Sequence, residues 1–346
     1  MFTSSTQPST TSSIESPHSP WIPPELVSLI LTKLWEEPLS SAERAASLQN
    51  IVLVNRTWLT IVAPITSCDV HILNERGAYT FVASIPKHPY HKDLFSSEAS
   101  RFIDEMCRSI TFHVDGNTPR GGLAKTTPAV WDVSQLDAAI AHVLYTTPGR
   151  PHRLTNLRHM SFQYTDWAYD DIFEQLKWHH VPKQVTHLSI NYSFSDSASI
   201  TTFESATMLR RSSRRSIRWS SHIKRVSFSG VSTRLVAIFF RELVCSNVES
   251  LEIAHPVQLA ALAPLPPRVH TLILCHPGIA ISQDTMESWG LEAALDAGLF
   301  REGIRPRIVV RSGTPDPVAF IGLKRTSEGF NAELVYERDD FRKGGC

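Results

Sequence analysis

Histidines are numerous enough in this sequence to raise acid–base catalysis or metal binding, the two kinds of chemistry for which imidazole is most often used. Fifteen occur among 346 residues. His88, His91 and the pair His179-His180 have no neighbouring cluster of Cys or Asp that would complete a metal site. The sequence also lacks a nucleophile elbow, a Gly-rich phosphate-binding loop and the zinc motif H-E-x-x-H. We therefore predict no enzymatic activity, no cofactor and no bound metal; the alternative is an enzyme with a pocket that these motifs do not describe.

One pair of histidines takes equivalent positions in two similar segments. His255-Pro256 follows Ile253, and His276-Pro277 follows Leu274. If both segments are neighbouring strands, about 4.8 Å apart, the two imidazoles should lie side by side. We favour solvated turn side chains over a functional site for this pair.

A dense basic run lies in the middle of the chain, at Arg210, Arg211, Arg214, Arg215 and Arg218. Such a run could be a basophilic kinase site, a nuclear-import signal or a patch for an acidic partner. A solvated loop is the interpretation that we favour.

The composition excludes several classes of protein. The 34 basic and 34 acidic residues cancel, so no global charge attracts nucleic acid or an anionic membrane, and we predict neither as a partner. No apolar run approaches the roughly eighteen residues of a membrane-spanning helix. Five cysteines without paired spacing do not indicate a disulfide framework. The first twenty residues lack the features of a secretory signal or a mitochondrial presequence. The expected compartment is therefore the cytoplasm, the nucleus or both.

A short apolar pattern recurs along most of the chain. It has the form Φ-x-x-Φ-x-Φ, where Φ is an apolar residue, and its starts lie between 21 residues (Val248 to Val269) and 50 residues (Cys107 to Leu157) apart. The copies are Cys107–Ile110–Phe112, Leu157–Met160–Phe162, Val185–Leu188–Ile190, Ile223–Val226–Phe228, Val248–Leu251–Ile253 and Val269–Leu272–Leu274, with an earlier trace at Val70 and Ile72. Each copy predicts a strand, and Ile308–Val310 and Leu334–Tyr336 are predicted as terminal strands.

The segments between these strands carry apolar residues at helical spacing. Helices are predicted over Trp131–Leu144, Asp170–Trp178, Thr233–Val244 and Thr285–Leu295. Alternation of strands and helices predicts an α/β fold with a stacked parallel sheet and helices on one side of it. The alternative, a flat doubly wound sheet, is disfavoured because the Gly-rich turns usual after its strands are absent.

Strand alternation predicts which side chains face away from the helices. This face should carry His187, Asn191, Arg225 and Glu252, which we propose as the side chains that recognise a protein substrate. Serines should align across three strands on the same face, at Ser161, Ser189 and Ser227. The alternative is a solvated face with no partner.

Before the repeats, residues 1–20 are rich in Ser, Thr and Pro and are predicted to be disordered. A compact helical block should then span residues 21–66. Leu26, Leu29, Ile30 and Leu34 recur at helical spacing. Ser40 and Glu43 form a predicted capping box for a second helix. A further break is expected near Asn55, and Pro64 should end the block.

Two elements of this block resemble an F-box. Ile22-Pro23-Pro24-Glu25-Leu26 matches its opening Leu/Ile-Pro-x-Glu, and Val54-Asn55-Arg56-Thr57-Trp58 matches its closing Val-x-Arg-x-Trp. The block is similar to the F-box-like proteins of mushroom-forming fungi. The resemblance implies docking on the Skp-type adaptor of a cullin–RING ubiquitin ligase. Carried over by position, the adaptor-binding residues are Ile22, Pro23, Leu26, Ile30, Val54 and Trp58. The alternative is a helical cap with no adaptor.

The whole chain resembles an F-box protein with degenerate leucine-rich repeats, in which residues 67–346 form an irregular solenoid around a parallel sheet. The Asn or Cys that normally follows each repeat strand is absent, so irregular curvature is expected. This resemblance implies a substrate-recognition subunit of a Skp–cullin–F-box ubiquitin ligase. A protein-interaction scaffold that never joins a ligase is the alternative.

Overall fold

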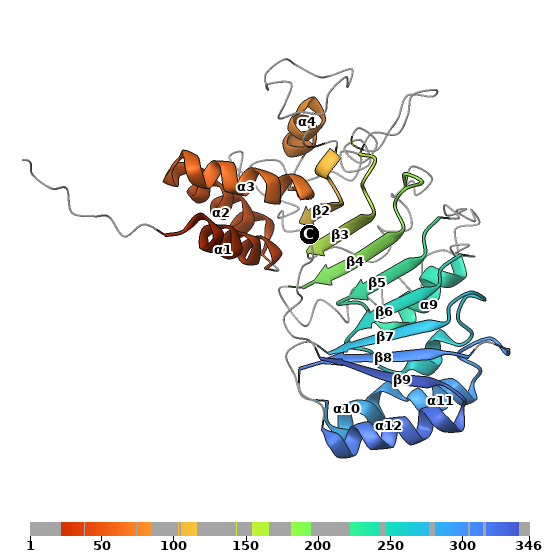
Figure 1. The fold of residues 1–346 in the computed structure, drawn as a ribbon. Coiled ribbons are helices and arrows are strands. Elements are labelled where there is room, and N and C mark those ends of the chain that lie inside the picture. Colours follow the sequence, from red (N-terminus) through yellow and green to blue (C-terminus); the bar gives the residue numbers. More distant parts are fainter. Residues whose placement is uncertain are drawn as a thin grey trace, which may run out of the picture.

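The computed structural model describes residues 22–37, 39–73, 75–84, 103, 105–115, 143, 154–165, 181–194, 222–242, 247–276, 281–303, 305–313 and 316–338. Within these ranges the chain begins with α1 (Pro24–Glu36), α2 (Ser41–Val54) and α3 (Arg56–Cys68), which together we call the helical unit (Figure 1). The predicted helices Trp131–Leu144 and Asp170–Trp178, the basic run Arg210–Arg218 and the N-terminal tail lie outside the described residues, apart from Val143, which is helical.

The helical unit folds around a small core. Val27, Leu31 and Trp35 are buried at four-residue spacing along α1, and Val27 and Leu31 pack with Ile51 and Val62 from α2 and α3. The buried stripe of α1 is thus one residue away from the predicted one. Of the predicted stripe only Leu34 packs against the core, at its margin. Leu26 and Ile30 each lie about 100° around the helix from the buried residue that follows them, which leaves them exposed.

The ends of these helices follow from their sequences. The predicted capping box is confirmed: Glu43 N–H donates to Ser40 Oγ at 3.3 Å, and Ser40 N–H donates to Glu43 Oε2 at 2.9 Å. Asn55 separates α2 from α3, and its side chain accepts a hydrogen bond from Trp58 N–H at 2.9 Å. The prediction that Pro64 ends the block is wrong, since α3 continues to Cys68. Burial of Val62 and Cys68 on either side of the proline offsets the hydrogen bond that it removes.

Nine parallel strands follow in one sheet, in chain order from β1 to β9. They are β1 (Asp69–Ile72), β2 (Ser109–Asp115), β3 (His159–Thr165), β4 (His187–Ser193), β5 (Arg225–Ser229), β6 (Ser250–Ala254), β7 (Thr271–His276), β8 (Arg307–Ser312) and β9 (Glu333–Arg338). Every predicted strand is present, so the α/β class with a parallel sheet is confirmed. A doubly wound sheet reverses its strand order at a switch point, and this sheet has none.

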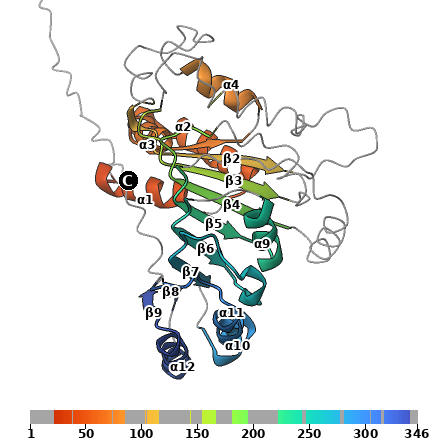
Figure 2. The same cartoon turned by 90° about the vertical axis from the view of Figure 1, so that its right-hand side faces the viewer.

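Helices cover one face of this sheet. After α4 (Glu75–Ser84), the described helices are α9 (Thr233–Glu242), the short 3₁₀-helix η2 (Leu259–Leu262), α10 (Gln283–Trp289), α11 (Leu291–Asp296) and α12 (Pro317–Gly329). Figures 1 and 2 show α9–α11 on one side of the sheet and the helical unit on the other, near β1 and β2. The predicted helix Thr285–Leu295 is two helices, because Gly290 takes a left-handed φ of 59° between them.

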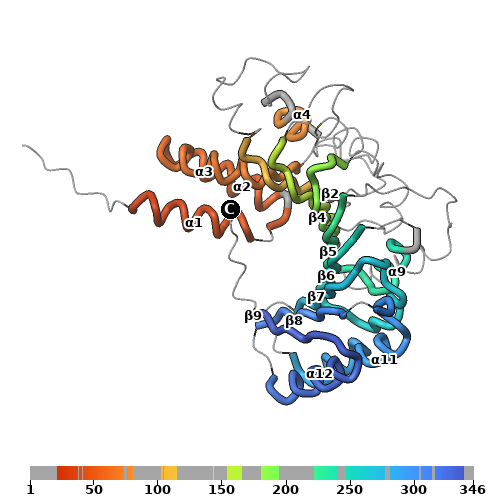
Figure 3. Tube along the Cα trace, turned by 45° about the vertical axis from the view of Figure 1, so that its right-hand side comes forward, coloured from red at the N-terminus to blue at the C-terminus, as the bar shows by residue number. Residues whose placement is uncertain are grey.

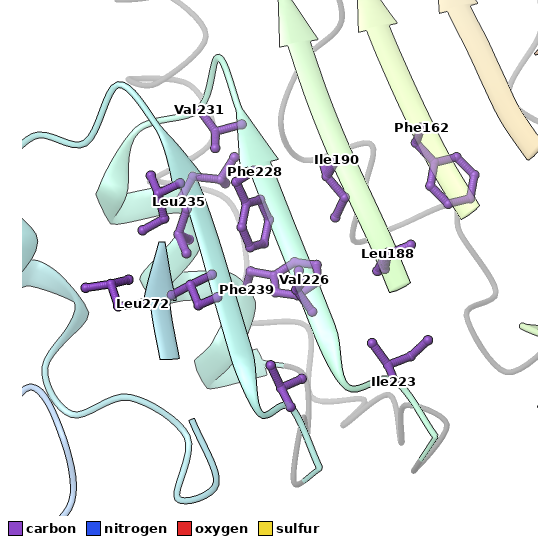
Figure 4. Packing of buried hydrophobic residues seen from close by; sticks show 14 of the residues in the cluster. Phe162, Leu188, Ile190, Ile223, Val226, Phe228, Val231, Leu235, Phe239 and Leu272 are labelled. Atoms are coloured by element: carbon purple, nitrogen blue, oxygen red, sulfur yellow. The ribbon is translucent and has the colours of Figure 1, made fainter. Parts of the chain in front are cut away.

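The main core lies between the sheet and its helices. The Φ side chains of the repeat are all buried, among them Leu188, Val226 and Leu272. Leu235 and Phe239 of α9 pack against this layer, with the rings of Phe239 and Phe228 4.9 Å apart (Figure 4). Buried side chains from Val70 in β1 to Ala332 before β9 form one continuous cluster. No helix in the described segments is long and apolar enough to span a membrane.

Candidate functional site

The sheet face opposite α9–α11, called the polar face below, has the predicted register. Ser161, Ser189 and Ser227 are paired in sequence across β3, β4 and β5, and Glu252 of β6 follows in the same row. His187 and Arg225 are register partners in a parallel row. The prediction that these side chains share one face is therefore confirmed.

Hydrogen bonds tie the centre of the polar face together. His159 Nε2 and Ser189 Oγ are 2.7 Å apart, and Ser189 Oγ and Ser227 Oγ are 2.6 Å apart. Asn191 Nδ2 donates to Ser161 Oγ at 3.2 Å. One of these contacts joins two serines, and the other two hold the longer side chains of His159 and Asn191 against the serine row.

The charged end of the polar face centres on Glu252. Its side chain is only 7% exposed and lies between the guanidinium groups of Arg225 and Arg311. Arg225 Nη2 donates to Glu252 Oε2, and Arg311 Nη1 lies 3.5 Å from Glu252 Oε1. Arg311 Nη2 also donates to Glu337 Oε2 at 2.8 Å. These contacts form a chain of alternating charges across β5, β6, β8 and β9.

Several positions that strand alternation places on the polar face are nevertheless buried, among them Ser161, Glu252 and Ile273. Glu252 is buried in its ion pairs, and Ile273 is buried in a small apolar cluster with Cys275 and Val309. Apolar side chains of neighbouring strands cover one another on this part of the face. The side chains of Arg225 and Arg311 contact Glu252 and shield it from solvent. Glu252 therefore holds Arg225 in place rather than offering a free carboxylate.

The other predicted recognition residues remain accessible. His187 is exposed and Asn191 is partly exposed. The Arg225 side chain is 34% exposed. Partial burial, and then the nearby positive charge of Arg225, lower the pKa of His187 below its ordinary value. The imidazole of His187 is therefore neutral at neutral pH and can both donate and accept a hydrogen bond.

The helical unit contacts the polar face through Trp35, a junction that the sequence did not predict. Trp35 Nε1–H donates to the backbone oxygen of Asp69 at 2.8 Å. Its ring meets His71 edge-on, with centroids 5.2 Å apart, and the guanidinium of Arg44 lies 4.9 Å above it. The available signal was the alternation of β1 and β2. It places His71 on the polar face opposite Thr111, and His113, two residues further along β2, on the same face.

Two buried histidines lie beneath this junction. His71 Nδ1 and His113 Nε2 are 2.7 Å apart, and His71 Nε2 is 3.1 Å from Asp69 Oδ2. Burial, followed by the charges of His71 and Arg44, lowers the pKa of His113 to about 3. Burial also lowers the pKa of His71, although Asp69 opposes that effect. Both imidazoles are therefore neutral at neutral pH, and the two histidines form a buried hydrogen-bonded chain with Asp69, which also has a hydrogen bond with the Ser109 side chain.

Large apolar side chains are exposed on the helical unit. Leu26, Leu29 and Ile30 are 50%, 56% and 52% exposed on one face of α1. The set that we call the apolar helix surface comprises Ile22, Leu26, Leu29, Ile30, Val52, Leu53 and Val54. Leu26, Leu29 and Ile30 share one face of α1, and exposed apolar side chains that cluster in this way mark interaction sites more often than isolated ones do.

The residues predicted to bind an adaptor fall largely on this surface. Ile22, Leu26, Ile30 and Val54 are each about half exposed, and Pro23 is exposed. Trp58 differs, since it is partly buried and packs against the core of the helical unit. Its substitution would therefore disturb the fold as well as the surface.

Comparison of the chain with protein-family models, curated proteins and solved structures finds no match.

Proposed function

We propose that this protein is a substrate-recognition subunit of a Skp–cullin–F-box ubiquitin ligase, with the helical unit docking the Skp-type adaptor and the polar face binding a protein substrate. The observation that carries the proposal is the exposure of Ile22, Leu26, Ile30 and Val54. The F-box resemblance assigns these apolar positions to the adaptor. Burying them in an interface would contribute about 25 cal/mol of binding free energy per Å² of apolar surface removed from water.

The arrangement of the sheet supports the second half of the proposal. Sequential parallel strands with helices on one face leave the other face open, as in a leucine-rich-repeat-like solenoid, and such faces commonly bind partners. His187, Asn191 and Arg225 offer hydrogen bonds and charge there, and Glu252 holds Arg225 in place. In such a complex catalysis belongs to other subunits, and the compartment is the cytoplasm or the nucleus.

The adaptor half is tested by co-expressing the full chain with a fungal Skp-type adaptor. Wild-type protein should co-purify with it, and Leu26→Asp or Ile30→Asp should abolish co-purification, because each places a charge in the centre of an apolar contact. The matched control is Val318→Asp, since Val318 is 71% exposed on α12, at the opposite end of the sheet. Failure of the wild-type protein to bind the adaptor at micromolar concentrations would favour a scaffold outside any ligase.

The substrate half is tested by affinity capture in cells with two variants of the polar face. His187→Asp and Asn191→Asp should each remove specific partners while leaving adaptor binding intact, because they alter accessible side chains far from the apolar helix surface. Arg225→Glu is a poorer choice, since it would set a second carboxylate against Glu252 and weaken the fold. An unchanged set of captured partners for both variants would exclude the polar face as the substrate site.

A further inference from the structure

His255 and His276 lie at the ends of two adjacent strands, where β6 and β7 finish together. The pairing of these strands runs to Ala254 and Cys275, and the two histidines are the next residues of each. Their Nδ1 atoms are 2.8 Å apart. The ring centroids are 4.8 Å apart and the ring planes cross at 82°. The side-by-side placement predicted from the sequence is thus correct. The two Nδ1 atoms share a hydrogen bond, and a metal ion bound by both nitrogens would replace the proton between them.

The backbone around His255 helps to hold this arrangement. His255 has a φ of 53°, a left-handed conformation that residues other than glycine rarely adopt. Its N–H donates to the backbone oxygen of Cys275 at 2.8 Å, and the following Pro256 is buried. The turn is therefore fixed at both sides of His255, which directs its imidazole toward His276 instead of leaving it free in solvent.

The pair is also open to solution, since His255 is exposed and His276 is partly exposed. No group of three or more potential metal ligands occurs in the described segments, so an ion here would have two protein ligands and complete its coordination with water.

The separation of the two nitrogens selects among metal ions. With metal–nitrogen distances of about 2.0–2.1 Å, ligands at a right angle have nitrogens about 2.9 Å apart, whereas tetrahedral ligands have them about 3.3 Å apart. The observed 2.8 Å fits the right angle of tetragonal coordination, which Cu²⁺ and Ni²⁺ prefer. Zn²⁺, which prefers a tetrahedron, would need the rings to move apart.

We propose that His255 and His276 form a two-histidine binding site for a divalent transition-metal ion of tetragonal preference, Cu²⁺ or Ni²⁺. The site lies at the end of the sheet where β6 and β7 finish, and it is independent of the proposed ligase function. The open coordination positions face solvent, so a donor group from a partner or a small chelating ligand can join the same ion.

The test uses the full-length protein without an affinity tag, freed of metal by chelation and titrated with CuCl₂, NiCl₂ and ZnCl₂. Calorimetry should give one Cu²⁺ site of higher affinity than that for Zn²⁺, and electron paramagnetic resonance of the copper complex should show coupling to two nitrogens. His255→Asn and His276→Asn should each weaken Cu²⁺ binding by more than the roughly 10–100-fold that loss of an outer-sphere partner costs.

The variants are chosen to separate metal binding from folding. Asparagine tolerates the left-handed conformation better than most residues do, so His255→Asn preserves the backbone turn. His270→Asn is the matched control, because His270 is also exposed and lies at the other end of β7, beside Thr271. It should leave Cu²⁺ affinity unchanged, and circular dichroism without metal should show all three variants folded. Unchanged Cu²⁺ affinity in both His255→Asn and His276→Asn, or a copper signal from a single nitrogen, would overturn the proposal.

Discussion

At the level of single side chains, Glu252 shows how the polar face is stabilised. The Glu252 carboxylate is nearly excluded from water and contacts both Arg225 and Arg311. Arg311 also forms an ion pair with Glu337. Removing one member of a buried ion pair leaves its partners without compensation, whereas removing an exposed member costs little. The buried Glu252 should therefore contribute much more to the free energy of unfolding than the exposed Glu337.

Glu252→Gln should lower the free energy of unfolding by about 2 kcal/mol, since two arginines lose their shared charge. Urea denaturation at neutral pH measures this loss. Glu337→Gln is the matched control, because Glu337 also pairs with Arg311 but is 42% exposed, and it should cost less than about 0.5 kcal/mol. Equal losses in the two variants would show that Glu252 does not hold the network together.

At the level of elements, the helical unit and the sheet meet at Trp35. The indole spans both, through its hydrogen bond to Asp69 and its contact with His71. Figure 3 shows α1 beside the first strands of the sheet. The proposed ligase subunit would need the helical unit and the polar face to keep one relative position, so that a bound substrate has one orientation.

The buried histidines at this junction make stability depend on pH. Burial lowers the pKa of His113 from 6.5 to about 3, and it lowers that of His71 as well. Above pH 6.5 the histidines are neutral in both the folded and unfolded states, so their burial does not lower the free energy of unfolding. As the pH falls from 6.5 toward 3, His113 takes up its proton only in the unfolded state, so stability is lost, and the lowered pKa of His71 acts in the same direction.

We expect the free energy of unfolding to fall between pH 6.5 and 5, with His113 contributing up to about 1.4 kcal/mol per pH unit. Urea denaturation across this range gives the slope. His113→Gln should reduce the slope, because the side chain no longer titrates, whereas His270→Asn, at an exposed position, should leave it unchanged. A slope that is the same in wild-type protein and His113→Gln would contradict the assignment.

The sequence predicted some of these features and missed others for identifiable physical reasons. The strands and their register depend on local alternation of apolar and polar residues, so Leu188 and Ser189 were assigned to opposite faces correctly. The burial of Glu252 and the contact of Trp35 with β1 depend on which distant segments meet, and local alternation does not contain that information. The exposure of Leu26 and Ile30 was anticipated only through the F-box resemblance, because helical spacing alone placed them in the buried stripe.

At the level of the whole molecule, the continuity of the main core governs how the chain unfolds. One cluster of buried side chains runs under all nine strands, and each strand pairs with its sequence neighbours. In repeat proteins each element is stabilised by its neighbours, and the sequential strand pairing of this sheet provides the same kind of contact. Because every strand is hydrogen-bonded to the next one in the sheet, we expect the sheet to unfold as one unit.

Leu188→Ala in β4 and Leu272→Ala in β7 test this expectation, since both leucines are almost completely buried. Each should cost about 2–5 kcal/mol through lost contacts and the cavity left behind. Hydrogen exchange should show both variants weakening amides along the whole sheet, from β2 to β8, by similar amounts. Ser189→Ala, next to Leu188 on the polar face, should change exchange only locally. If Leu272→Ala accelerated exchange only in β6–β9, the sheet would consist of independently unfolding parts, and the helical unit and the far end of the polar face would not keep one relative position.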